Sequence, residues 1–186
     1  MTDEPILTLE PFIDAVRGGV QSRGWALSGL QKTTSHQFEG RWEGDSTRSG
    51  YLFFHHPEGP DTASIDVFLD ETSRGLTGNL ALVLELRPLE ELGDVQSALS
   101  RLGEIAAAAL PQGVRHPLTL RARLRDATDR SGAAEVSVRF KVTIARGVIG
   151  NGSGAVSQLA EAATRAFDRL LELGPLEEFL LPEDGT

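Results

Sequence analysis

The sequence predicts an α+β fold: one antiparallel sheet of about six to seven strands, with two long amphipathic helices on one face. Two observations carry this prediction. Residues 118–144 alternate between apolar and polar side chains in two runs, and over residues 156–171 the period lengthens to that of a helix. Neither the strands nor the helix can hide an apolar side from water alone. The helix is therefore expected to cover one face of the sheet.

The two alternating runs are typical of half-buried strands. In residues 118–125 leucine and alanine alternate with Thr119 and three arginines, and in residues 136–144 valine, phenylalanine and isoleucine alternate with polar residues. The polar stretch between the runs is short enough for a hairpin loop, so the two strands are predicted to pair antiparallel.

The helix after this hairpin is expected to be capped by Asn151 or Ser153 and to end at Gly174-Pro175. The glycine-rich stretch before it, residues 147–154, offers backbone N–H groups to an anion at a helix N-terminus. It lacks the Lys-Ser/Thr of a P-loop, and its spacing does not give G-x-G-x-x-G. We therefore interpret it as a flexible connector.

The upstream pattern completes the order αβββ-ββα-ββα. A first helix is expected from about Leu9 to Gln21, although Gly18 and Gly19 each cost about 1 kcal/mol relative to Ala inside a helix. Asp94 is the expected N-cap of a helix that runs to Leu110. Strands are expected at 25–32, 36–43, 50–56, 64–70 and 77–87.

We interpret residues 1–186 as a single domain. Its expected parts are an N-terminal helix and β-meander (8–60), a first ββα unit (61–113), a second ββα unit (114–175) and an acidic amphipathic tail (176–186). The two ββα units match in length and pattern, which suggests an internal duplication, but their residue identity is too low to prove one.

Composition narrows the classes of function. The chain has no cysteine, which excludes a disulfide framework, thiol chemistry and Cys-ligated zinc. It has no long apolar run and no basic-then-apolar N-terminus, so we expect a cytoplasmic protein without a membrane partner. The net charge of −9 opposes binding to nucleic acid. Only two of its 18 basic residues are lysines, which fits a GC-rich bacterial genome.

Positive charge nevertheless gathers in residues 115–146, which carry +5 while the remainder carries −14. The alternation places five cations on one sheet face: Arg121, Arg123, Arg125, Arg139 and Lys141. The forked guanidinium groups of the four arginines suit carboxylate or phosphate, which favours a protein partner or nucleic acid. The favoured alternative is neutralisation by cross-strand acids, for which the candidates are Glu39, Glu43, Asp66, Asp70 and Glu85. No aromatic residues interleave with the arginines as nucleic-acid stacking requires.

Aromatic residues suggest a second site. A pocket between sheet and helices is expected to be lined by Trp25, His36, Phe38, Trp42 and Tyr51, although such residues more often form core.

Two further groups are candidates for a partner surface. Phe53 and Phe54 are adjacent in a strand, so one of them must face away from the core. In the tail, Leu176, Phe179 and Leu180 form an amphipathic latch.

No pattern indicates a cofactor or a metal. His55 and His56 would point to opposite sides of a strand, so they could share a weak divalent site with Glu58 and Asp61 only if the strand has already ended. The four histidines match no helical H-x-x-x-H spacing. The sequence has no G-x-S-x-G elbow and no carboxylate pair that spacing alone fixes. A histidine–carboxylate pair across the sheet, for example at His36, is left open. A non-enzymatic protein is favoured over an enzyme.

Three hypotheses of function follow. The first is an adaptor or chaperone-like module, expected to be a homodimer, that binds a polypeptide through a sheet face or helix groove. Small acidic bacterial secretion chaperones mix antiparallel strands and amphipathic helices comparably, but no motif is shared and no family membership is inferred. The second is a small-molecule binding protein or cofactor-free enzyme that uses the aromatic pocket. The third is a phosphate or nucleic-acid binder that uses the arginine-rich face. The sequence identifies no partner or ligand and leaves the strand order undetermined.

Overall fold

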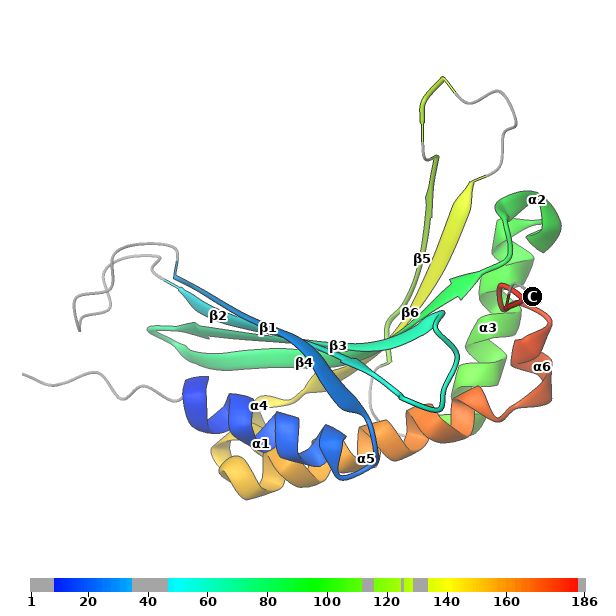
Figure 1. The fold of residues 1–186 in the computed structure, drawn as a ribbon. Coiled ribbons are helices and arrows are strands. Elements are labelled where there is room, and N and C mark those ends of the chain that lie inside the picture. Colours follow the sequence, from blue (N-terminus) through cyan, green and yellow to red (C-terminus); the bar gives the residue numbers. More distant parts are fainter. Residues whose placement is uncertain (1–8, 35–46, 112–115, 125, 129–133, 184–186) are drawn as a thin grey trace, which may run out of the picture.

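The computed structural model describes residues 9–34, 47–111, 116–124, 126–128 and 134–183 (Figure 1). These residues form one six-stranded antiparallel sheet with helices on one side, which confirms the predicted α+β class. The predicted strand at 36–43 lies outside the described residues.

Every pair of neighbouring strands in the sheet is antiparallel, and the strands follow the order β1-β2-β3-β4-β6-β5. Their bounds are β1 Ala26–Thr34, β2 Arg48–His55, β3 Ala63–Thr72, β4 Gly75–Leu86, β5 Leu118–Arg123 and β6 Glu135–Ile144. The second strands of the two predicted ββα units, β4 and β6, are therefore neighbours. That the two ββα units arose by an internal duplication stays a prediction.

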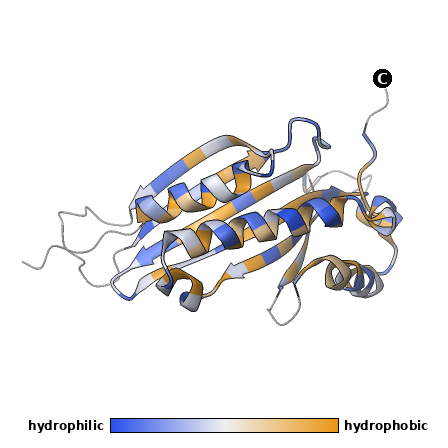
Figure 2. Cartoon of the chain, turned by 90° about the horizontal axis from the view of Figure 1, so that it is seen from below, coloured by the Kyte–Doolittle hydropathy of each residue, from blue (hydrophilic) through white to orange (hydrophobic). Residues whose placement is uncertain are grey.

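Six helices occur among the described residues: α1 Leu9–Gln21, α2 Leu89–Leu92, α3 Val95–Ala109, α4 Arg146–Gly150, α5 Ser153–Leu171 and α6 Gly174–Glu177. Figure 2, seen from the helix side, shows α1 and α5 side by side over the sheet. α3 packs beside β5 at the end of the sheet that curls upward in Figure 1.

Strand alternation separates the two faces of the sheet as the period of two requires. In β3 the residues toward the helices, from Ala63 to Glu71 in steps of two, are buried, and those between them are only half-buried. In β6 the buried series runs from Val136 to Ile144. These series join the apolar stripes of α1, α3 and α5 in one hydrophobic core.

Gly19 explains why α1 runs through a pair of glycines that its sequence disfavours. A Cβ atom at Gly19 would lie 2.5 Å from the Ser157 carbonyl oxygen and 2.8 Å from Ala160 Cβ in α5. The bare glycine therefore allows the backbones of α1 and α5 to approach closely. Gly18 is exposed, and a Cβ atom there would meet nothing within 4 Å.

An ion cluster holds the beginning of α1 against the sheet. Leu9 N–H donates to Glu71 Oε2 at 3.0 Å, and Arg48 donates to Glu71 Oε1 at 2.9 Å and also pairs with Glu10. Glu71 is only 2% exposed, so these hydrogen bonds replace those that water would otherwise supply to its carboxylate. Burial acts to raise the pKa of Glu10, but the hydrogen bond and charge of Arg48 outweigh it, and the pKa is lowered.

One of the two predicted helix caps is confirmed. Asp94 accepts hydrogen bonds from Ser97 N–H and Ser97 Oγ–H, both at 2.9 Å, at the start of α3. The prediction for α5 is wrong: its N-cap is Gly152, which has φ 94° and no side-chain cap. Positive φ favours glycine, which explains the residue. The expected flexible connector before it contains the short helix α4.

Candidate interaction surface

The sheet side opposite the helices, here called the open face, is concave and carries no helix of the described segments (Figure 1). Cross-strand pairing sets its residues in rows. One row runs from Tyr51 through Phe68 and Asn79 to Thr143. The next row runs Phe53, Asp66, Ala81, Lys141, and the third runs Ser64, Val83, Arg139, Thr119.

Tyr51, Phe53 and Phe68 form an aromatic patch on the β2–β3 part of the open face. The Tyr51 and Phe68 ring centroids are 4.8 Å apart at an interplanar angle of 40°. Tyr51 is 37% exposed and Phe53 is 39% exposed. Phe53 pairs with Gly29 of β1, where an added Cβ atom would lie 3.4 Å from the Phe53 ring. The ring therefore lies against a strand position that has no side chain.

The prediction that one of two adjacent phenylalanines faces away from the core is confirmed. Phe54 is fully buried under the helices, and Phe53 is on the open face. Phe54 is therefore not available to a partner.

Beside the patch, the cations on the open face are partly neutralised by acids. Arg139 donates to Asp66 Oδ2 at 3.1 Å across the sheet, as the cross-strand alternative predicted. Burial raises the pKa of Asp66, and the Arg139 charge and a Ser64 hydrogen bond only partly oppose it. Lys141 neighbours Ala81 and has no ion pair within the described segments. Arg125 lies outside those segments.

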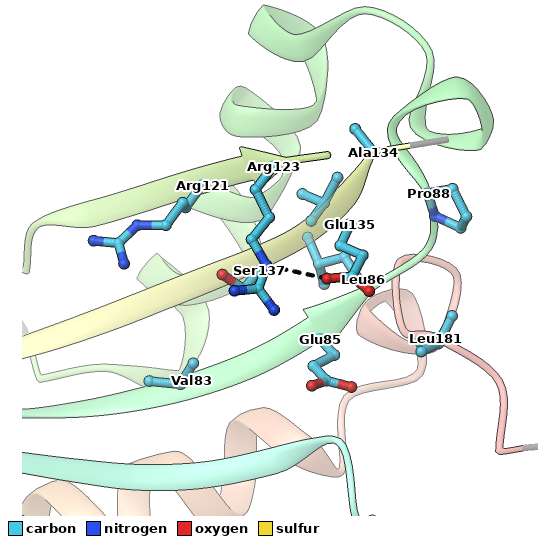
Figure 3. A pocket seen from close by; sticks show the side chains of 11 residues that line it. Val83, Glu85, Leu86, Pro88, Arg121, Arg123, Ala134, Glu135, Ser137 and Leu181 are labelled. Carbon is cyan, nitrogen blue, oxygen red and sulfur yellow. Dashed lines mark hydrogen bonds and ion pairs between the residues drawn. The ribbon is translucent and has the colours of Figure 1, made fainter. Parts of the chain in front are cut away.

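A pocket of about 590 Å³ opens at the other end of the open face, between β4, β6 and β5 (Figure 3). Arg123 Nε donates to Glu135 Oε2 at 3.1 Å inside it, while Arg121 and Glu85 point away from this pair. No histidine is among the described residues that line it, so Ser137 has no neighbouring imidazole base. The arrangement can bind charged groups of a ligand, but it shows no nucleophile with its base.

The predicted aromatic pocket does not form from its described members. Trp25 is buried on the helix side, where Trp25 Nε1–H donates to Asp168 Oδ1 at 2.9 Å, and Arg23 donates to Asp168 Oδ2 at 3.2 Å. Tyr51 is on the open face, so the sheet separates these two residues. His36, Phe38 and Trp42 lie outside the described residues.

Two of the three histidines that the structure describes, His56 and His116, have structural contacts. The His56 ring meets Trp25 edge-on at 5.4 Å, and His56 Nδ1 accepts from Glu58 N–H at 3.2 Å. Within the described ranges, His, Asp and Glu side chains form no group of three that could hold a metal ion.

The tail is a latch on its own chain. Leu176 is fully buried, Phe179 is 4% exposed, and the Arg101 guanidinium lies 4.9 Å from the Phe179 ring centroid. Arg87 N–H donates to the Phe179 carbonyl, and Leu181 N–H donates to the Glu85 carbonyl. Leu180 is half-buried and bridges Leu86. The prediction that Leu176 and Phe179 belong to a partner surface is therefore wrong, because both side chains are buried against the core and the end of β4.

Sequence reasoning missed Phe68 and Asp168. Phe68 gave a visible signal, because it stands on the polar side of an otherwise regular alternation between Ser64 and Asp70. Asp168 gave none. It resembles any other charged residue on the exposed side of a helix, and its partner Trp25 is 143 positions away.

Comparisons with protein-family models, with curated proteins and with solved structures find no match for this chain. None of the helices that the structure describes combines the length and the apolar character needed to cross a membrane. The functional inference therefore depends on the geometry and chemistry of the open face.

Proposed function

We propose that this protein is a non-enzymatic interaction module that binds a polypeptide partner across the open face of its sheet. The observation that carries the proposal is the aromatic patch, where Tyr51 and Phe53 are exposed side by side with Phe68. Exposed apolar groups that cluster mark interaction sites, and aromatic residues are enriched in the centres of interfaces.

The surroundings of the patch support this proposal. Hydrogen-bonded polar residues border it: Asp66 binds Arg139, and Ser49 Oγ–H donates to Asp70 at 2.7 Å. An apolar centre with a polar rim is the usual anatomy of a protein interface. The concave sheet allows a partner to contact the patch and the charged end of the face at the same time (Figure 1).

The partner is either a different polypeptide or a second copy of this chain. Light scattering on a size-exclusion column separates the two possibilities, because self-association through the patch gives a mass of twice the 20.0 kDa chain. Phe53→Ser should then restore the mass of one chain. A wild-type mass of one chain assigns the patch to a different polypeptide.

The test compares exposed apolar residues inside and outside the patch. Tagged wild type, Tyr51→Ser with Phe53→Ser, and Leu30→Ser are expressed in the native cells, and co-purified proteins are quantified by mass spectrometry. Leu30 is the matched control, because it is 43% exposed and pairs with Leu52 of the helix-facing series of β2. The patch variant should lose a partner that wild type and Leu30→Ser retain. Equal recovery with all three proteins would contradict the proposal, provided that circular dichroism shows all three folded.

A further inference from the structure

Strand β5 forms one edge of the sheet, and half of its backbone groups point outward. Lys141 N–H donates to the Pro117 carbonyl at 3.0 Å, and hydrogen-bonded pairs alternate along an antiparallel ladder. The N–H and C=O groups of Leu118, Leu120 and Ala122 therefore point away from β6. In the described part of the chain no other backbone reaches them.

The side chains of this edge strand divide by chemistry. Leu118 and Leu120 pack against the core, whereas Thr119, Arg121 and Arg123 are exposed on the open face. Arg123 is engaged by Glu135. Arg121 stands opposite Ser137, has no ion pair with any described residue, and borders the pocket of Figure 3. The edge thus combines unpaired backbone groups with an available guanidinium.

We infer that β5 accepts an extended acidic segment of the partner as an additional antiparallel strand, with a carboxylate of that segment bound to Arg121. The inference rests on the proposed function in that the partner is a polypeptide, and it names the chemistry of that partner. Backbone hydrogen bonds to an exposed sheet edge supply affinity, and alternate side chains supply specificity. The Arg fork binds a carboxylate through two parallel hydrogen bonds.

Charge complementarity favours an acidic segment of the partner as the strand that pairs with β5. Residues 115–146 carry +5 in a chain whose remainder carries −14, so the edge attracts acidic segments. A second copy that paired β5 with β5 would bring the arginines of both strands onto one face, where like charges repel. The opposite edge, β1, carries a single Lys and an irregular register between Leu27 and Gly29, a feature that discourages strand addition.

Fluorescence anisotropy with labelled peptides tests this inference directly. The probe is EVEVEVE, whose glutamates can lie on the side of Arg121 and whose valines can supply the ladder N–H groups. KVKVKVK reverses the charge, and EPEPEPE keeps the charge but removes the N–H donors. Only EVEVEVE should bind, and its affinity should fall as salt rises.

Two protein variants separate charge from strand pairing. Arg121→Glu should weaken EVEVEVE binding by about tenfold or more, because it replaces the carboxylate-binding cation with a like charge. Ala122→Pro removes an outward N–H from an exposed edge position and leaves the bonds to β6 intact, so it should have a similar effect. Arg74→Glu, in the exposed turn between β3 and β4, is the charge-matched control and should bind as wild type.

Equal binding of EPEPEPE and EVEVEVE, or wild-type affinity in Ala122→Pro, would overturn strand addition, and the EPEPEPE result does not depend on how any variant folds. A change in solution mass in Ala122→Pro would also overturn it, because β5 would then pair with a second copy. If Phe53→Ser loses the native partner while Arg121→Glu and Ala122→Pro retain it, this inference fails and the proposed function stands. If none of the three variants loses that partner, both fail.

Discussion

At Gly19 the crossing of α1 and α5 leaves no room for a side chain. Gly19→Ala would place Cβ against the backbone of Ser157 and the side chain of Ala160, and we expect it to lower the free energy of unfolding by about 1–3 kcal/mol. Gly18→Ala should raise it by about 0.5–1 kcal/mol, because Gly18 is exposed and Ala favours a helix. Urea unfolding of both variants measures the difference. Equal effects of the two substitutions would mean that the helices can move apart at no cost.

The raised pKa of Asp66 makes the free energy of unfolding depend on pH in a defined direction. Burial raises the folded-state pKa of Asp66 above its unfolded value of 3.8, so the folded state binds the proton more tightly. As pH rises from the unfolded pKa through the raised folded pKa, ionisation of Asp66 therefore costs stability. Asp66→Asn should remove this cost at pH values above the raised folded-state pKa. It should leave the free energy of unfolding unchanged at pH values well below the unfolded pKa.

Urea unfolding of wild type and Asp66→Asn at about pH 3 and about pH 7 tests this dependence. The variant should gain stability relative to wild type at the higher pH only. A relative loss at that pH would show that the ion pair with Arg139 outweighs the burial of Asp66.

At the scale of elements, Glu71 couples the beginning of α1 to strands β2 and β3. Glu71→Ala removes the acceptor of the Leu9 N–H and an ion-pair partner of Arg48, and it should lower the free energy of unfolding by about 3 kcal/mol. Glu161→Ala, which removes an exposed ion pair with Arg165 in α5, should cost less than about 0.5 kcal/mol. Chemical denaturation compares them. A similar small cost for both would contradict the role of Glu71 as an anchor of α1.

Removing the Phe179 side chain from the tail should lower the stability of the protein. Phe179→Ala leaves a cavity beneath Arg101 and should lower the free energy of unfolding by about 3 kcal/mol, without weakening the native partner of the patch. Differential scanning calorimetry measures the first effect and quantitative co-purification the second. Loss of the partner from a fully folded Phe179→Ala protein would contradict this and show that the tail is part of the partner-binding surface.

Elements with a strong local pattern could be predicted from the sequence. The alternation in β3, β5 and β6, the bounds of α1 and the Asp94 cap follow from short-range rules and are present. The N-cap of α5 could not be predicted, because Gly152 acts through its positive φ and not through a side-chain acceptor. The short helix α4 was missed since its glycines indicate a loop.

At the scale of the whole molecule, the arrangement of the open face depends on pairings that no local pattern contains. Placing β6 between β4 and β5 brings Arg139 to Asp66 and sets Arg121 beside the pocket, although these residues lie far apart in the sequence. The exposure of one aromatic residue at positions 53 and 54 was predictable from alternation. Only the three-dimensional structure shows that Tyr51 and Phe68 lie near Phe53 on the open face and that Trp25 lies on the other side of the sheet.

The central claim is that a polypeptide partner lies on the open face. Site-specific photo-cross-linking in the native cells tests it most directly, with benzoylphenylalanine at position 53 and, as control, at the exposed Gln158 of α5. We predict that position 53 forms a cross-link to a defined polypeptide and that position 158 does not. Cross-links to the same proteins from both positions, or none from position 53, would contradict the account.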